Sequence, residues 1–558
     1  MRRIDPYVLG ILLLAAVARF WGLSFGLPYI DARPDETTIT TVALGFFSGD
    51  FNPHFFNYPT FYMYCVYLLC YGAYLYGLLR GQYQSPTDFM LHYSVDPAGF
   101  LLLDRGLSAL LGTLTVFVVY KITRELCDRR TALVASFFLA LAHLHVRDSH
   151  FGVTDVAATF LIMCAVLFIH RSYADQRLRS YIYAGLLVGL AASTKYAGAL
   201  LVAPICFLYG LYLWTGKGSR ARRLIDWRIL AFVSALVGAF FLGTPYALLD
   251  YARFRSGLQF EMEHLLRGHL VVMQTGWVYH LRFSLLLGLG WSLFAASLAG
   301  IVLLLRKDSK KAALLCLFPV LYYITIGRGH TVFLRYAMPL VPFLCITGAI
   351  TVVALADAIR RRVQAPRYLI TPLLAALIVL PSARSVVWTD LLLARKDTRL
   401  LALQWMKANL PAGASVYMTP VSWRGPTPLN ALELLRKNPF PPPSVVAADP
   451  TAPFSVLPRY DEWKSPVRPR ASTAGGERNA AYPRYLIMRE SALKAFDLPL
   501  EPPTAPSREG YRLKQSFIAI DPKARGDWFD QQDAFYVPFA GFEGAKRPGP
   551  NIYVYERE

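Results

Sequence analysis

The chain has 558 residues, of which 55% are hydrophobic and only 17% are charged. This balance is too apolar for a soluble protein of such length and indicates a membrane protein. The formal charge of +21 comes from 58 Lys and Arg against 37 Asp and Glu, but the basic residues cluster in short breaks between apolar runs, as they do in cytoplasmic loops. The charge therefore predicts orientation in a membrane, and we expect no nucleic-acid partner.

Apolar stretches long enough to cross about 30 Å of hydrocarbon recur along the first two thirds of the chain. They lie at 8–28, 100–120, 131–146, 156–170, 181–194, 198–215, 229–247, 281–305, 312–327, 334–357 and 368–384. We therefore predict a polytopic α-helical membrane protein with about eleven transmembrane helices.

If the N-terminus is cytoplasmic, the basic breaks between these stretches all share its side of the membrane. These breaks lie at 121–130, 171–179, 217–228, 306–311 and 360–367. An odd number of spans then puts the C-terminal part outside. We expect a multi-pass protein of the cell (inner) membrane.

The stretch 59–79 is also apolar enough to span, but a single crossing there would invert every later loop. Its six tyrosines suit the headgroup region, where a phenol meets water while its ring is buried. We predict that it lies along the surface, within a large first outer loop at 29–99. An ordinary span with a partner helix in 81–99 is the alternative.

From about residue 390 the sequence becomes polar and rich in proline. A helical spacing of apolar residues at 400–410 accompanies several short strand-like runs. The runs lie at 415–418, 485–488, 516–520 and 552–555. We predict a membrane domain at 1–389 and a soluble, extracytoplasmic mixed α/β domain at 390–558, in which 439–476 is a long loop or a partly disordered insertion.

Carboxylates follow two of the predicted spans on the outer side. Asp35 and Glu36 come directly after Pro34, and Asp155 follows Thr154 at the outer end of another span. Carboxylates at a membrane surface are costly unless they have a role. The alternative is helix capping, since acidic side chains favour a helix N-terminus.

Cations are predicted at the same depth as these carboxylates. Lys195 opposes the positive-inside bias, and Arg105, Arg282 and Arg335 lie near outer ends of spans. Snorkelling to lipid headgroups is the alternative for each. Together, carboxylates and cations suit a substrate that has a hydroxyl to deprotonate and a phosphate to bind.

The histidines give a weaker signal. The pairs His143/His145 and His264/His269, the latter near Glu261, have spacings that metal ligands can have, but such pairs are more often structural. No cofactor is indicated with certainty, and a divalent metal is left open. Neither an Asp-x-Asp nor a Gly-rich phosphate loop occurs, which disfavours a soluble nucleotide donor.

An ordered set of segments resembles the GT-C membrane glycosyltransferases, in particular the dolichyl-phosphate-mannose protein mannosyltransferases and the bacterial aminoarabinose transferases of lipid A. The resemblance extends from Arg19 to about Arg384. The segments are Pro34-Asp35-Glu36, Asn57-Tyr58-Pro59, Arg105 with Ser108 to Thr113, His150 to Asp155, Thr194-Lys195-Tyr196, and Leu334-Arg335-Tyr336.

This resemblance implies a polyprenyl-phosphate sugar donor and an outer-facing cavity in which Asp35 is the general base. It assigns Glu36 and Asp155 to the catalytic centre and Lys195 to the donor phosphate. The matching segments suggest substrate-binding roles for Tyr58, Arg105, His150, Lys195, Tyr196, Arg335 and Tyr336, and Arg282 is a further candidate because it lies near the outer end of a span. The acceptor would be a protein, lipid or glycan. The chain has Thr37-Thr38 where the aminoarabinose transferases carry Arg-Tyr, so lipid A is not implied as the acceptor.

A transporter or flippase of lipid-linked sugars is the rival function, since it also needs charges within the membrane. That class predicts broken helices or internal repeats, and no convincing repeat is present in the sequence. A scaffold with a degenerate site is a third reading.

Overall fold

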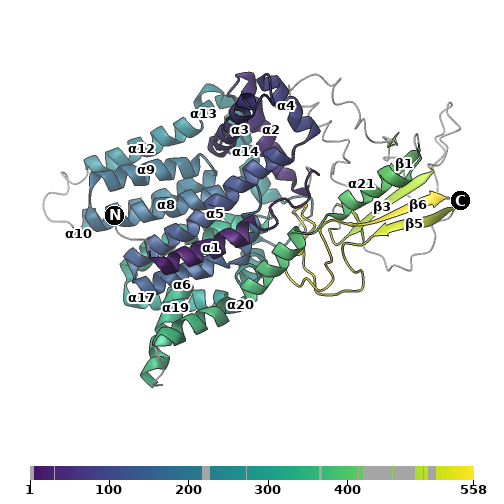
Figure 1. The fold of residues 1–558 in the computed structure, drawn as a ribbon. Coiled ribbons are helices and arrows are strands. Elements are labelled where there is room, and N and C mark those ends of the chain that lie inside the picture. The colour runs from purple at the N-terminus through teal and green to yellow at the C-terminus, as the bar shows by residue number, and fades with distance from the viewer. Residues whose placement is uncertain are drawn as a thin grey trace. The chain divides into compact units, whose positions relative to one another are not determined.

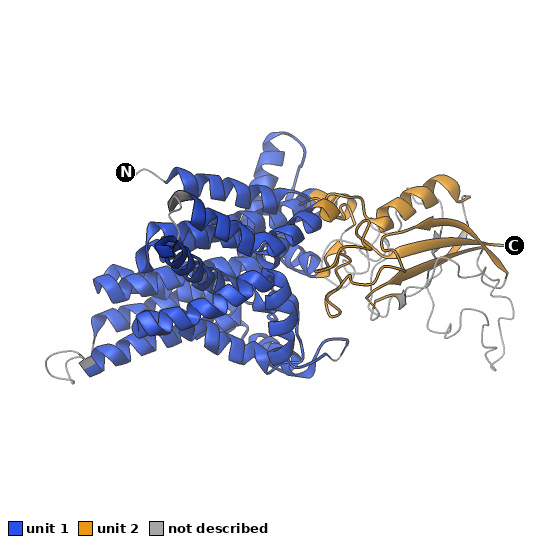
Figure 2. Cartoon of the chain, turned by 90° about the horizontal axis from the view of Figure 1, so that it is seen from below, with its two compact units in different colours: residues 1–23, 35–90, 99–390 blue, residues 24–34, 91–98, 391–558 orange. Residues whose placement is uncertain are grey.

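The structure, a computed structural model, describes residues 5–29, 32–215, 226–271, 273–362, 367–411, 414–418, 455–456, 484–493, 496–499 and 510–558. The chain is mostly helical, with a small sheet near the C-terminus (Figure 1). This architecture confirms the predicted fold class, a polytopic helical membrane protein with a C-terminal mixed α/β domain. The chain divides into two compact units (Figure 2).

Unit 1 comprises Met1–Leu23, Asp35–Met90 and Gly99–Asp390. Its elements are helical, and the ends of α4 and α20 and the first residues of α2 and α5 extend into unit 2. They are α1 (Pro6–Phe20), α2 (Pro34–Gly45), η2 (Phe46–Ser48), α3 (Phe61–Leu79), α4 (Pro86–Val95), α5 (Ala98–Leu126), α6 (Arg129–Ala140), α7 (His143–Asp148), α8 (Thr154–Asp175), α9 (Leu178–Ala192), η3 (Tyr196–Leu201), α10 (Val202–Thr215), α12 (Trp227–Gly243), α13 (Tyr246–Leu249), α14 (Tyr251–Arg267), α15 (Gly276–Tyr279), η4 (His280–Leu285), α16 (Leu286–Leu289), α17 (Trp291–Lys307), α18 (Ser309–Gly327), η5 (Leu334–Leu340), α19 (Val341–Arg362) and α20 (Arg367–Leu393).

Within the described residues, seven helices are long and apolar enough to cross a membrane, or up to eight if one bent pair is a single span. The bent pair, Gly276–Leu289 and Trp291–Lys307, turns by 110°. The predicted stretch 131–146 is divided between α6 and α7, so its apolar length does not form one continuous helix. The predicted number of spans therefore stays a prediction.

Helix α3 meets the same length and hydropathy criteria as the other candidate spans. These criteria do not separate a helix that crosses the membrane from one that lies in its surface, so the surface orientation predicted for 59–79 stays a prediction. Its rings form an aromatic cluster with the preceding turn, in which Phe47 contacts Tyr67 and Tyr74 at centroid distances of 5.2 and 5.8 Å.

Small residues bring the helices of unit 1 close together. A Cβ atom at Gly185 or Gly189 of α9 would lie 2.3 Å from a backbone oxygen of α12. In α17, Ser297 donates to the carbonyl of Leu344 in α19 at 2.7 Å, and Gly300 leaves no room for a side chain against Thr347. Close approach through small residues is the usual packing of helices in lipid, where the hydrophobic effect does not drive association.

Unit 2 comprises Ser24–Pro34, Leu91–Ala98 and Leu391–Glu558. Its elements are a helix and the strands of one sheet. They are α21 (Thr398–Asn409), β1 (Ser415–Met418), β2 (Ser455–Val456), β3 (Tyr485–Ser491), β4 (Leu498–Pro499), β5 (Tyr511–Phe517) and β6 (Asn551–Arg557). In the described residues the strand order is β2-β1-β3-β6-β5, with β4 paired to β3.

The sheet of unit 2 is mixed: β1 is parallel to β2 and β3, whereas β6 is antiparallel to β3 and β5. Apolar residues of α21, such as Ala402 and Met406, are buried against Val416, Ile487 and Val554 of the sheet. The predicted runs 415–418, 485–488 and 552–555 fall within strands, whereas 516–520 only overlaps the end of β5. Apart from β2, the segment 439–476 lies outside the described residues.

Residues 24–34 belong to unit 2 although they follow the first helix. The ring of Phe25 meets that of Phe535 edge to face at 5.7 Å, and the Arg399 guanidinium lies 4.4 Å from the centre of the Tyr29 ring. Arg33 forms a buried ion pair with Asp533. The chain that leads into α2 is thus part of the folded C-terminal unit.

Candidate functional site

Two carboxylates and two cations meet in unit 1. Arg335 of η5 pairs with Asp35 through Nη2 and Oδ2 at 2.7 Å, and its Nε lies 3.7 Å from Asp155 Oδ2. The Lys195 ammonium pairs with Asp155 Oδ1. We call Asp35, Asp155, Lys195 and Arg335 the charged cluster. Its members come from four separate parts of the chain.

Local sequence explains how each member is positioned. Asp35 follows the proline that begins α2, and Asp155 lies in the first turn of α8, where the helix dipole favours an anion. Lys195 occupies the extended residue before η3, which interrupts the apolar run after α9. Arg335 lies in η5, before α19. The cluster therefore gathers at helix termini.

The four side chains differ in their exposure. The Asp35 side chain is 34% exposed, against 4% for Asp155, 6% for Arg335 and 18% for Lys195. Asp35 is thus the carboxylate of the cluster that an arriving molecule reaches most easily, while Asp155 holds the two cations in place. Charges removed from water in this way interact strongly with one another.

Aromatic rings line the charged cluster. The Lys195 ammonium lies 4.9 Å from the centre of the Tyr336 ring, and the Arg335 guanidinium 4.1 Å from that of Phe333. Burial and the nearby Asp35 carboxylate raise the pKa of the Tyr58 phenol well above its usual value. Tyr58 therefore stays a neutral phenol. The hydroxyl of Tyr196 donates a hydrogen bond to the carbonyl of Phe56 at 2.7 Å.

Glu261 of α14 also faces the cluster. The pKa of its carboxyl is raised to about 7, mainly because the group is buried. The cations Lys195 and Arg335 lower this pKa, and the Asp35 carboxylate raises it. In the sequence, Glu261 is distinguished only by its position near the histidine pair His264/His269. The signal that could have found it is the apolar periodicity of 251–267, because an amphipathic helix directs its two faces toward different surroundings.

Glu36 and Arg105 form a second, separate pair. Arg105 donates to both Glu36 oxygens, with Nε–Oε1 at 3.0 Å and Nη2–Oε2 at 2.7 Å, and neither side chain is exposed. Glu36 also accepts from the Gly152 amide at 2.9 Å, and Arg105 donates to the Leu23 carbonyl at 2.8 Å. This geometry ties α2 to α5 and to the loop before α8, and it gives the pair a structural role.

His150 and Arg282 make other contacts. The fully buried His150 ring has its Nδ1 3.0 Å from the Val146 carbonyl and its Nε2 2.8 Å from that of Trp21. Arg282 is exposed in η4, and its guanidinium lies over the adjacent Phe283 ring. Among the described residues, no ion pair joins either side chain to the charged cluster. The structure thus unites Asp35, Asp155, Lys195, Arg335 and Tyr336 but not His150 or Arg282.

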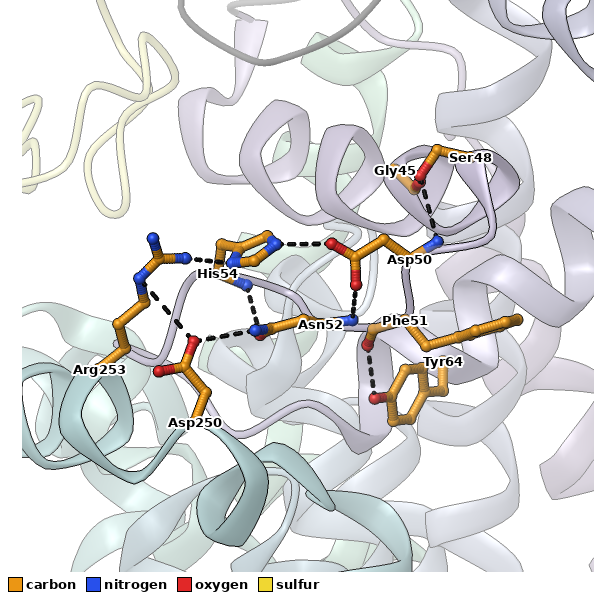
Figure 3. A network of polar contacts seen from close by, with 9 residues as sticks. All are labelled: Gly45, Ser48, Asp50, Phe51, Asn52, His54, Tyr64, Asp250 and Arg253. Carbon is orange, nitrogen blue, oxygen red and sulfur yellow. Dashed lines mark hydrogen bonds and ion pairs between the residues drawn. The ribbon is translucent and has the colours of Figure 1, made fainter.

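A polar network fixes the loop between α2 and α3 (Figure 3). Asp50 accepts from His54 Nε2 at 2.7 Å, and Asn52 donates to Asp250 at 2.9 Å. The other ring nitrogen of His54 contacts Arg253 of α14. These contacts hold the loop against the start of α14. Tyr58 lies in this loop and Glu261 lies in α14, so the two residues belong to segments that are bonded to each other.

No group of three or more His, Cys, Asp and Glu in the described ranges has the geometry of a metal site. His264 and His269, whose spacing had suggested one, contact each other with Nε2–Nδ1 at 3.0 Å. His143 Nε2 lies 2.8 Å from Thr389 Oγ1, and His145 Nδ1 lies 3.0 Å from an Arg19 nitrogen. Each of these histidines thus has a polar contact within the chain.

Comparison with protein families gives one match. Residues 105–245 match the family described as dolichyl-phosphate-mannose-protein mannosyltransferase. The matched segment includes Asp155 and Lys195 and lies within the range of the resemblance found in the sequence. It confirms the predicted resemblance to the GT-C membrane glycosyltransferases. No curated protein sequence matches the chain.

Several solved structures are similar. The archaeal oligosaccharyltransferase AglB of Archaeoglobus fulgidus, in complex with an inhibitory peptide and a dolichol-phosphate, is 14% identical, with a TM-score of 0.45 over 75% of this chain and 62% of that one. ArnT of Cupriavidus metallidurans, bound to undecaprenyl phosphate, is 18% identical, with a TM-score of 0.46 over 72% and 73%. The present chain thus spans about three fifths of the length of the solved oligosaccharyltransferase.

A third similar structure is the protein O-mannosyltransferase complex of S. cerevisiae bound to the sugar donor. It is 21% identical and has a TM-score of 0.34 over 46% of this chain and 34% of that one.

Proposed function

We propose that this chain, which resembles the GT-C membrane glycosyltransferases, transfers a glycosyl group from a polyprenyl-phosphate-linked sugar to an acceptor hydroxyl. The sugar would be a hexosyl or pentosyl group, and the acceptor a protein, lipid or glycan. The basic loops predict that the cluster and the C-terminal domain face the outside of the cell (inner) membrane. The observation that carries the proposal is the ion pair between the partly exposed Asp35 and Arg335.

The charged cluster suits such a transfer because it offers a proton acceptor beside two cations. A donor phosphate that binds Lys195 and Arg335 would take the place of Asp35 beside Arg335 and leave the Asp35 carboxylate free, while Asp155 keeps its contacts with both cations. Asp35 would then remove the proton of the acceptor hydroxyl. The acceptor oxygen would attack the anomeric carbon from the face opposite the phosphate, with inversion.

Bond cleavage in this reaction leaves charge on the phosphate. The bond between the anomeric carbon and the phosphate oxygen would break, and its electron pair would stay with that oxygen. Lys195 and Arg335 stabilise this charge because they are fixed in advance by Asp155 and by the rings of Tyr336 and Phe333. Preorganised cations in a partly buried site are effective at this task.

Replacement of the proposed base tests the mechanism. We expect Asp35→Asn to slow transfer by about 10²–10⁴-fold, the usual contribution of a general base, while the protein stays folded and still binds polyprenyl phosphate. Consumption of a radiolabelled polyprenyl-phosphate sugar by proteoliposomes measures turnover. The matched control is Asp96→Asn, because Asp96 is exposed and accepts from the Ala98 amide through an oxygen that asparagine keeps. Wild-type turnover in Asp35→Asn would remove Asp35 from the mechanism.

The transporter alternative has one observation in its favour, the 110° bend between Gly276–Leu289 and Trp291–Lys307. Broken helices often line substrate paths in transporters. The same proteoliposomes separate the two functions. An enzyme consumes the lipid-linked sugar and releases polyprenyl phosphate, whereas a transporter moves it intact to the other leaflet. A chain that does neither would be a scaffold.

A further inference from the structure

Helix α14 is attached to the site at one end through Phe254. The Phe254 ring meets that of Phe56 at 5.9 Å and that of Tyr196 at 6.0 Å. Tyr196 directly follows Lys195 in the chain. Residues seven apart in a helix share a face, so Glu261 projects from the same side of α14 as Phe254.

The other end of α14 is attached close to Arg335. The Leu265 carbonyl accepts from the amides of His330 and Thr331 at 3.0 and 3.2 Å, and these residues lead into η5. Glu261 lies one turn before Leu265 on the helix. Its carboxyl is therefore located between the segment that carries Lys195 and the segment that carries Arg335.

Electrostatic interactions agree with this location. Glu261 interacts electrostatically with Lys195, Arg335 and Asp35. Its carboxylate in turn raises the pKa of the phenols of Tyr58 and Tyr196. On α14 itself, His264 faces the same Arg335 and Asp35 charges. In the part of the chain that the structure describes, no hydrogen bond or ion pair engages the Glu261 carboxyl.

The charges around Glu261 do not balance when every group is ionised. Two cations, Lys195 and Arg335, then face three carboxylates, those of Asp35, Asp155 and Glu261. A phosphate would add a further negative charge in a partly buried site, where repulsion is strong. One proton on a carboxylate restores neutrality before the phosphate arrives. Asp35 and Asp155 are engaged by the cations, which leaves Glu261 to carry that proton.

We propose that Glu261 is part of the subsite for the donor phosphate and that its protonated carboxyl donates a hydrogen bond to a phosphate oxygen. This assignment rests on the proposed function and adds a residue to it. A carboxylic acid that stays neutral near pH 7 can act as a donor to an anion. The ionised form has no proton to give and repels the phosphate.

The pH dependence follows from the protonation state. Since the pKa of Glu261 is raised to about 7, the donating form dominates below pH 7 and is lost as the pH rises through that value. Bound phosphate raises this pKa further, because a neighbouring anion disfavours ionisation. The affinity for phosphate is therefore highest below pH 7 and falls above it. Well above pH 7, the dissociation constant should increase by about tenfold for each pH unit.

Binding of undecaprenyl phosphate to the purified full chain in detergent tests the proposal between pH 6 and pH 9. The ligand itself titrates at about pH 6, but that effect is common to all variants and cancels in the ratio of their dissociation constants. We expect wild type to lose affinity above pH 7 relative to Glu261→Gln, whose neutral amide can still donate. The control Glu263→Gln should follow wild type, because Glu263 is 41% exposed and pairs with Arg267 at 2.8 Å.

A measurement on the wild type alone covers the case in which Glu261→Gln does not fold. Calorimetry at pH 8 in two buffers with different ionisation enthalpies reports proton uptake, which we expect to approach about one proton per phosphate bound. Equal pH profiles for wild type and Glu261→Gln, or no proton uptake, would overturn the role of Glu261 and leave the proposed function intact. No binding by wild type at any pH would instead overturn the proposed function.

Discussion

Asp35 and Glu36 are adjacent in the sequence but occupy different environments. Asp35 is 34% exposed beside Arg335, whereas Glu36 is fully buried against Arg105. Consecutive residues of a helix point about 100° apart, so the first turn of α2 directs one carboxylate to the charged cluster and the other into the protein. The resemblance of the sequence to a known family assigned both to the catalytic centre, and only the direction of each side chain distinguishes them.

Other residues of the cluster could be anticipated from the sequence for a physical reason. A carboxylate or lysine at the end of an apolar run must lie at the membrane surface, so topology alone brings Asp35, Asp155, Lys195 and Arg335 to a common depth. The pairing of Lys195 with Asp155, and of Arg335 with Asp35, depends on how the helices pack. The sequence does not contain that information in any local pattern.

Removal of the Glu36 charge should destabilise the membrane unit. Glu36→Gln leaves Arg105 buried without its anionic partner, and breaking a buried pair in this way costs about 3–5 kcal/mol. A lower unfolding temperature in detergent is the expected result. The control is Glu125→Gln, because the Glu125–Arg171 pair of 2.6 Å is about one third exposed and such pairs contribute about 1 kcal/mol or less. Equal stability of the two variants would contradict the structural role of Glu36.

At the scale of elements, α9 connects helix packing to the site. Gly185 and Gly189 contact the backbone of α12, and three residues after α9 ends the chain reaches Lys195. The apolar runs predicted most of the long helices because hydrocarbon requires the backbone to be hydrogen-bonded internally. They did not predict α14, since an amphipathic helix has no long apolar run.

A side chain at Gly189 should separate α9 from α12. Its Cβ would lie 2.3 Å from the Leu236 carbonyl oxygen, so we expect Gly189→Val to cost about 1–3 kcal/mol through overpacking and to lower polyprenyl-phosphate affinity by displacing Lys195. Thermal unfolding and lipid binding measure the two effects. Gly238→Ala on α12 is the control, because no atom lies within 4 Å of its added Cβ. Unchanged stability in Gly189→Val would show that the two helices can separate without cost.

At the scale of the whole molecule, the chain does not divide at a single point. Residues 24–34 and 91–98 belong to the same compact unit as residues 391–558. The change of composition near residue 390 marks where polar sequence begins, but a short segment such as 24–34 has no composition of its own to reveal where it packs. Its membership of unit 2 depends on distant contacts, among them the Arg33–Asp533 pair.

Loss of that pair should loosen unit 2. Asp533→Ala removes the anion from a buried arginine, with an expected cost of about 3 kcal/mol or more. Limited proteolysis should then cut more readily within 24–34 and 510–558, while the helical signal of the membrane unit is unchanged. Glu543→Ala, at an exposed position of the same unit, is the control. Equal protection of both variants would contradict the role of Asp533.

The ion pair between Arg33 and Asp533 also has a consequence for biosynthesis, because 500 positions of sequence separate the two residues. The ribosome synthesises Arg33 well before Asp533, so the folded environment of the segment that leads into α2 exists only after residue 533 has been translated. A prematurely terminated product would insert its helices but lack the support that this segment receives from unit 2. Folding of residues 24–34 is thereby linked to synthesis of the rest of unit 2.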